Sequence, residues 1–200
     1  MKLALALAGA VVLAGCATNE VSQQLASVPG VQIERDTSGN AFVASYQEKL
    51  SLKSDAKAES LSRCVSQVVV NHGVTLTGTA TTIGPYTGRM YATPTAQTGA
   101  GGSVIKFVSD DKRSVVAEGS ETYQGSGMAA MTQRNIRFTL SADLVGNALQ
   151  VKFDNLNTVQ LDTGVAANTG YHKLGAWSSA KPEEAIDAMR AVARKLRDCL

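Results

Sequence analysis

Hydrophobic and polar residues alternate in several short runs, which is the pattern of half-buried β-strands. Val31 and Ile33 alternate with polar neighbours, and residues 42–46 follow them after a turn at residues 37–40. Further single strands are expected near residues 74–76, 104–108 and 114–117.

The clearest strand pair lies in the second half of the chain. Two runs of alternating apolar residues flank residues 143–147, which end in Gly146 and Asn147 and suit a turn. The alternating residues are Ile136, Phe138 and Leu140 in the first run, and Leu149, Val151 and Phe153 in the second.

The apolar spacing changes to that of an amphipathic helix in two places. Residues 54–71 form the first, and Gly73 is expected to end it. The second helix is expected to carry Pro182 in its first turn, where a missing N–H has no cost. The two apolar stripes consist of Leu61, Cys64, Val65, Val68 and His72, and of Ala185, Met189, Val192, Leu196 and Cys199.

The order of these elements predicts an α+β fold: an antiparallel sheet of about five to six strands, with two helices packed on one face. Residues 125–133 and 156–178 show no clear period. The expected core consists of Leu61, Val65, Val68, Ile136, Phe138, Leu140, Val151, Phe153, Met189, Val192 and Leu196.

Part of this pattern resembles a known class of domains. The segments RFTLSAD at residues 137–143 and LQVKFDNL at residues 149–156 look like the central hairpin of exported domains of unknown function, whose fold is like one half of the TATA-binding protein. The resemblance extends over about residues 50–200 as a helix–strands–helix order. It implies that fold, carries over no site residue, and does not imply DNA binding.

The N-terminus has the layout of a bacterial secretory signal. Lys2 precedes an apolar run that is too short for the ~20 residues a membrane-spanning helix needs. Leu13-Ala14-Gly15-Cys16 then resembles the bacterial lipobox, which implies cleavage before Cys16 and lipid on that cysteine. Because Ala17 stands where an Asp usually signals inner-membrane retention, we expect attachment to the outer membrane, facing the periplasm.

These features divide the chain into a lipoprotein signal peptide at residues 1–15, a lipidated tether at residues 16–30 and a single α+β domain at residues 31–200. The charges are nearly balanced, with 19 Lys and Arg against 17 Asp and Glu. Nucleic-acid binding requires a clustered basic face, so this balance argues against a nucleic-acid partner.

Cys64 and Cys199 are the cysteines that remain once Cys16 is assigned to lipid. An exported chain enters an oxidising compartment, where thiol pairs become disulfides. Both cysteines lie on the core-facing stripes of the expected helices, so we predict a disulfide where the helices pack.

The sequence shows no convincing catalytic or cofactor site. His72 and His172 lie far apart, without the clustered ligands of a zinc site. A serine hydrolase elbow is absent from the sequence, and the oxygen-rich segment at residues 154–157 is broken by Leu156 as a calcium loop. We therefore expect no metal, no cofactor and no catalytic residue.

Residues 84–102 are rich in Gly and Pro and are expected to form a long loop. Tyr86, Arg89 and Tyr91, together with Met90, are residue types enriched at protein interfaces. They form the candidate partner-binding site, although the tyrosines could instead fold back over the sheet edge.

These observations favour a membrane-anchored envelope lipoprotein of non-enzymatic type that binds an envelope protein or a cell-wall component. A small periplasmic hydrolase whose site the sequence does not show is one alternative. A surface inhibitor of a wall-degrading enzyme is another. Converging polar groups in a pocket would favour the enzyme, and an exposed apolar patch would favour a binding protein.

Overall fold

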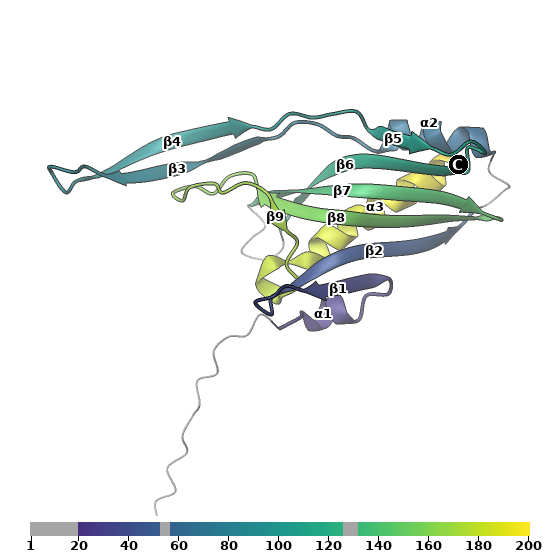
Figure 1. The fold of residues 1–200 in the computed structure, drawn as a ribbon, viewed down its shortest axis with the longest axis horizontal. Coiled ribbons are helices and arrows are strands. Elements are labelled where there is room, and N and C mark those ends of the chain that lie inside the picture. Colours follow the sequence, from purple (N-terminus) through teal and green to yellow (C-terminus); the bar gives the residue numbers. More distant parts are fainter. Residues whose placement is uncertain (1–19, 53–56, 126–131) are drawn as a thin grey trace, which may run out of the picture.

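A computed structural model describes residues 20–52, 57–125 and 132–200. Its centre is an antiparallel sheet in the order β1-β2-β8-β7-β6-β5, and the short strand β9 pairs with β8 (Figure 1). The strands are β1 (Val31–Arg35), β2 (Ala41–Ser51), β5 (Ile105–Val108), β6 (Ser114–Gln124), β7 (Gln133–Val145), β8 (Ala148–Gln160) and β9 (His172–Lys173).

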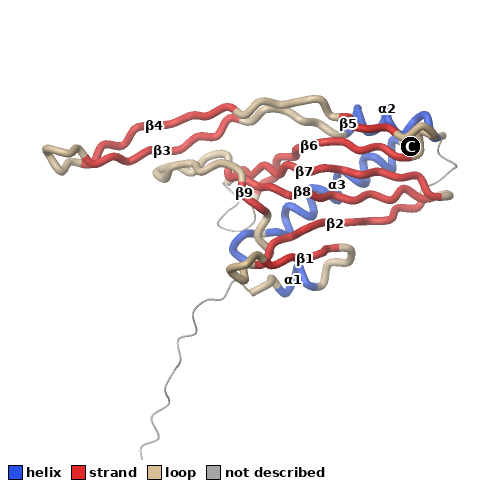
Figure 2. The backbone as a smooth tube through the Cα atoms, viewed as in Figure 1, coloured by secondary structure: helices blue, strands red, loops and turns tan. Residues whose placement is uncertain are grey.

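Two helices, α2 (Ala58–Val68) and α3 (Pro182–Cys199), cover one face of this sheet (Figure 2). The predicted α+β class, with an antiparallel sheet and two main helices on one face, is confirmed. A short 3-10 helix, η2 (Ser178–Ala180), precedes α3. Among the described residues, no helix has the length and apolar character needed to cross a membrane.

The core lies between the helices and the sheet. Phe153 is fully buried, and its ring meets Phe138 edge-on at 5.1 Å and stacks on Tyr46 at 6.1 Å. All of the predicted core residues are buried except Val68, which packs against the core while partly exposed.

The first main helix ends earlier than predicted. The structure ends α2 at Val68, so His72 lies outside the helix and Gly73 does not end it. Val69 is already extended, with ψ 129°, and is 2% exposed. Val70 then accepts a hydrogen bond from the Ser120 N–H of β6 at 2.7 Å. These β-branched valines favour extended backbone, and their packing on the sheet overrides the helical period.

The part of the predicted tether that the structure describes is folded against the domain, so the boundary at residue 31 is wrong. Val21 forms a bridge with Trp177, and Leu25 on the short helix α1 (Gln23–Ala26) is 1% exposed. Together with Val28, these residues have a helical apolar spacing that the surrounding Ser and Gln obscure. The domain therefore begins about ten residues before the predicted boundary.

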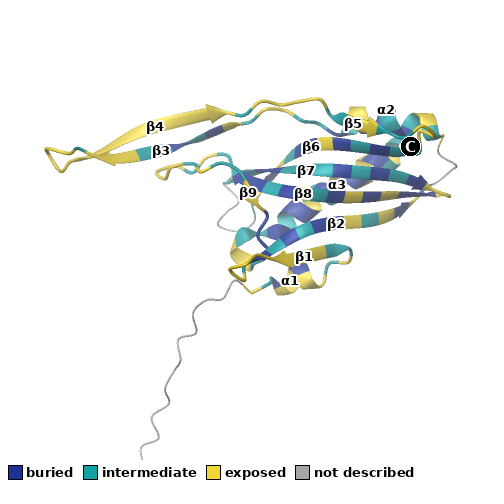
Figure 3. Cartoon of the chain, in the orientation of Figure 1, coloured by how far each residue is buried: buried dark blue, intermediate teal, exposed yellow. Residues whose placement is uncertain are grey.

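The largest departure from the prediction is at residues 84–102. The structure forms a second, two-stranded sheet from β3 (Thr75–Ile83) and β4 (Met90–Thr98), which projects beyond one end of the main sheet (Figure 1). We call residues 75–98 the arm. Every residue of β4 is exposed (Figure 3). Because β4 has no buried face, its sequence shows no apolar alternation, and the segment was predicted to be a loop.

Candidate functional site

The arm is held at its base by the segment that follows β8. Thr77 pairs with Asp162, and the Thr79 N–H donates to the Ala166 carbonyl at 2.9 Å. The Asn168 side-chain amide donates to the Thr77 carbonyl at 3.2 Å and to the Gln160 carbonyl at 2.9 Å. These bonds occupy the outer edge of β3 near the body, so the proximal half of the arm has a fixed direction.

Two chain segments cross closely where the arm joins the body. The Gly99 N–H donates to the Val74 carbonyl at 2.9 Å, and the Gly102 N–H donates to the Asn71 carbonyl at 3.1 Å. A Cβ at Gly101 would lie 2.3 Å from the Asn71 carbonyl oxygen, so only glycine fits there without a shift. Gly101 therefore allows the close packing of the two segments at this crossing.

Arg137 on β7 lies beneath this crossing. Its guanidinium carbon lies 4.2 Å from the centre of the Tyr171 ring, and Nη2 lies close to Gly99. The Tyr171 hydroxyl donates to Asn135 Oδ1 at 2.8 Å. Burial raises the pKa of Tyr171, and the charge of Arg137 opposes this effect. Nε and Nη2 of Arg137 are buried without a hydrogen-bond partner among the described residues.

A pocket of about 370 Å³ adjoins this crossing on the sheet face opposite the helices. Glu118, Arg137, Thr139 and Asn155 line it, but Glu118 is paired with Lys106 at 2.9 Å. The unpartnered nitrogens of Arg137 are covered by protein atoms, so a bound molecule does not reach them without movement of the chain. The pocket shows no nucleophile activated by an adjacent base.

The tip of the arm, residues 83–91, concentrates exposed apolar surface. Ile83 is 68% exposed, Tyr86 99%, Met90 73% and Tyr91 50%. They are four of the eight large hydrophobic residues that are exposed in the described part of the chain. Such side chains gathered on one projection mark an interaction surface more strongly than scattered ones do.

The local structure of the tip follows from its turn. The Gly84 N–H donates to the Arg89 carbonyl at 2.9 Å, and Gly88 has φ +64°, a conformation that favours glycine. A Cβ at Gly84 would lie 2.9 Å from the Tyr91 ring, so that ring rests against the backbone at this position. Tyr86 and Arg89 are exposed in the turn. The structure thus brings the three predicted partner-binding residues together, and Tyr86 does not fold back over the sheet.

The outer edge of β4 is interrupted by Pro94. In an antiparallel pair, alternate residues direct their N–H groups toward the partner strand and outward. Because Gly99 donates inward to Val74, the alternation directs the nitrogen of Pro94 outward, where its missing N–H breaks no pairing. Proline on a free edge hinders the addition of another strand.

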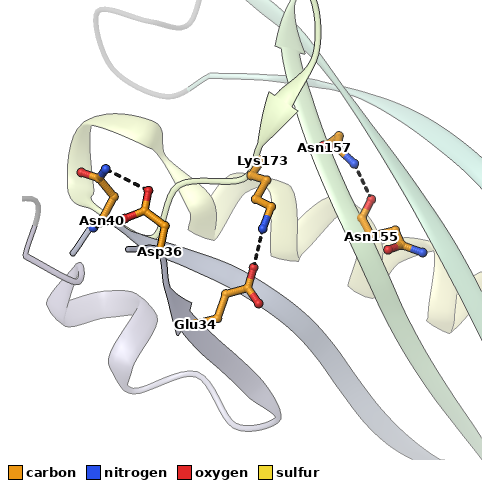
Figure 4. A network of polar contacts seen from close by, with 6 residues as sticks. All are labelled: Glu34, Asp36, Asn40, Asn155, Asn157 and Lys173. Atoms are coloured by element: carbon orange, nitrogen blue, oxygen red, sulfur yellow. Dashed lines mark hydrogen bonds and ion pairs between the residues drawn. The ribbon is translucent and has the colours of Figure 1, made fainter. Parts of the chain in front are cut away.

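A polar network lies where β9 meets β1 (Figure 4). Lys173 Nζ lies 2.9 Å from Glu34 Oε1, and the Asn157 amide donates to the Asn155 carbonyl at 2.8 Å. In the β1–β2 turn, the Asn40 amide donates to Asp36 at 3.0 Å and lowers the pKa of that carboxyl. These contacts pair most of the polar atoms with one another, as expected of a structural network.

Both histidines, His72 and His172, are exposed and lie on different segments. Within residues 20–52, 57–125 and 132–200, no three His, Cys, Asp or Glu residues are placed to hold a metal ion.

Cys64 and Cys199 form a disulfide, as the sequence analysis predicts. The S–S distance is 2.07 Å and the Cα atoms are 5.8 Å apart, which joins α2 to the last residue of α3. Cys16 lies outside the described residues, and its lipidation stays a prediction.

Comparison with known proteins gives one structural likeness to report. The crystal structure of a DUF4468 family protein from Bacteroides ovatus matches with a TM-score of 0.41 and 10% sequence identity, over 84% of this chain and 85% of that chain. No protein-family model matches the sequence, and no curated protein matches it.

Proposed function

We propose that this chain is an envelope lipoprotein, anchored through lipid on Cys16 to the periplasmic face of the bacterial outer membrane, that acts by binding and not by catalysis. The contact region is the tip of the arm, with Tyr86, Arg89 and Tyr91 as its principal residues. The expected partner classes are the membrane, an envelope protein and a cell-wall component.

The arm is the observation that carries this proposal. An isolated two-stranded hairpin is marginally stable in water. Here the hairpin is fixed at its base while its distal end exposes two tyrosines, an isoleucine and a methionine. Large aromatic side chains that are exposed to solvent favour burial against a binding partner.

Two variants test the two halves of the proposal. Cys16→Ser should abolish the uptake of labelled palmitate, since the acylated sulfur is gone; continued labelling would refute the anchor. The second variant replaces Tyr86, Arg89 and Tyr91 together with Ala.

The triple variant should keep its free energy of unfolding to within ~0.5 kcal/mol, because exposed side chains contribute little to stability. It should lose chemical crosslinks to envelope components in intact cells. Thr95→Ala with Gln97→Ala is the matched control, since both residues are exposed on β4 away from the tip. Crosslinks at the wild-type level in the triple variant would refute the tip as the contact region.

A further inference from the structure

The apolar residues of the tip lie on both of its faces. Ile83 and Met90 are paired across the two strands and therefore share one face. Tyr91 follows Met90 in the strand and lies on the opposite face, while Tyr86 is in the turn at the very end. A hairpin that docks sideways into a protein groove needs one apolar face. An apolar collar around the end suits insertion end-on into an apolar medium.

The charges of the arm suit a surface of lipid headgroups. The sequence contains no Asp or Glu between Glu59 and Asp110, and Arg89 is the only charged residue from Val74 to Val104. An arm with no acidic residue has little electrostatic cost in approaching a bilayer, and its single arginine, beside apolar residues, can extend its guanidinium to a phosphate group.

The arm and the start of the folded domain lie at the same end of the molecule. The described chain begins near the turn between β1 and β2, at the end of the sheet beyond which the arm projects (Figure 1). Val21, next to this start, bridges to Trp177, and Thr77 at the base of the arm bridges to Asp162. Gly84 is the seventh residue after Thr77, and a strand rises about 3.4 Å per residue, so the tip lies about 24 Å beyond that bridge.

The distance from Cys16 to the domain is shorter than this projection. Because Val21 is already part of the fold, only five residues of chain lead from it back to Cys16. Five residues span at most about 18 Å in full extension. If the strands stand perpendicular to the bilayer and this end of the sheet faces it at such a distance, a straight arm of about 24 Å reaches the lipid surface.

From these four observations we infer that the tip of the arm, residues 83–91, inserts into the interface of the same bilayer to which Cys16 is anchored. The inference rests on the proposed lipid anchor and names the bilayer as the partner of the tip. Insertion is shallow, because the backbone edges of the arm need water or headgroups as hydrogen-bond partners. The aromatic rings of Tyr86 and Tyr91 occupy the interface, where one end of a tyrosine is apolar and the other is wet.

The test uses the full acylated chain in vesicles of phosphatidylethanolamine with a minority of phosphatidylglycerol. Met90→Cys supplies a single free thiol for an environment-sensitive fluorophore, since Cys64 and Cys199 are joined and Cys16 carries lipid. Val145→Cys is the matched control: Val145 is 50% exposed and lies at the opposite end of the sheet. Only protein that floats with the vesicles and shows the acyl mass on Cys16 is measured.

We expect the label at position 90 to shift to shorter emission wavelength and to lose most of its quenching by aqueous iodide, while the label at position 145 keeps both properties of the water-exposed state. Equal iodide quenching at the two positions would overturn the inference. If the label at position 90 is shielded in native envelopes but quenched in these vesicles, the tip binds a protein or wall component, which overturns the bilayer as partner and leaves the proposed function standing.

A second variant excludes insertion that is caused by the fluorophore itself. Ile83→Asp with Tyr86→Asp, in the labelled Met90→Cys chain, places two charges in the collar and should restore iodide quenching to the level of position 145. Shielding that persists in this variant would overturn the assignment to the native side chains. A chain that lacks the acyl mass and fails to float refutes the proposed anchor separately, before the position of the tip is measured.

Discussion

The disulfide between Cys64 and Cys199 should supply a large share of the stability of the domain. It closes a loop with a sequence separation of 135 residues, which contains every element from α2 to α3. In the chain-entropy model, closing a loop of this length in the unfolded chain is worth about 5 kcal/mol. Domains are typically stable by only ~5–15 kcal/mol, so this contribution is comparable to the whole.

The perturbation is the replacement of both cysteines by alanine, Cys64→Ala with Cys199→Ala, compared with the wild type in urea. We expect the free energy of unfolding to fall by about 5 kcal/mol, and its dependence on urea to steepen because the unlinked unfolded chain is more expanded.

Reduction of the wild-type disulfide is the control, and it should reproduce the loss without any change of side chain. A loss below ~1 kcal/mol in both experiments would refute the reasoning, since it would mean that the unfolded chain gains little freedom from breaking the link.

Three smaller predictions follow from the packing. Phe153→Ala should cost ~3–5 kcal/mol in urea unfolding, since its ring is fully buried between two others, and a loss below ~1 kcal/mol would contradict that placement. Burial raises the pKa of Tyr46 from 10.0 to about 12, so the folded state holds this proton more tightly than the unfolded state does. The resulting stability is present below pH 10 and is lost as the pH rises toward 12. The variant Tyr46→Phe should not show this loss of stability between pH 10 and 12 in its unfolding free energy. Gly101→Ala should lower the melting temperature, because its Cβ would lie 2.3 Å from the Asn71 carbonyl oxygen, whereas Gly102→Ala, with a nearest contact of 3.4 Å, is the matched control; equal melting temperatures would contradict the tight crossing.

The elements that bury one face could be predicted from the sequence. The helix at Pro182–Cys199 and the hairpin of β7 and β8 each place apolar residues at the period of their structure, and these apolar faces are the ones buried between the sheet and the helices. The disulfide could be predicted because both cysteines lie on the apolar stripes of the two expected helices. Even here the turn was narrower than expected, since β7 continues to Val145 and only Gly146 and Asn147 separate the strands.

The start of β3 was expected as a strand near residues 74–76, where Leu76 is buried, but β4 could not be predicted because it is exposed on both faces. The period-2 signal of a strand arises from the difference between a buried and a solvated face, and β4 has no buried residue. Its threonines favour extended backbone, but Gly84, Gly88 and Pro94 indicated a loop more strongly. The residues of the candidate site were nevertheless recognised by type, since two tyrosines and an arginine are unusual in a polar linker.

The base of the arm depends on contacts between distant segments. Arg137 lies on a strand, Tyr171 lies in a segment without a period, and nothing in their spacing predicts that one stacks on the other. The alternation of the strand indicated only that Arg137 lies on its solvated face. Such long-range pairs are set by the sheet order, which the sequence pattern leaves open.

The most direct test of the central claim is photocrosslinking in intact cells with a photoreactive amino acid in place of Tyr86. The same amino acid in place of Val145, which is 50% exposed at the opposite end of the sheet, serves as the reference. If the tip is the contact region of a membrane-anchored binding protein, light should produce crosslinks to lipid or to an envelope component from position 86 and only background from position 145. Equal crosslinking from both positions, or none from position 86, would contradict the account.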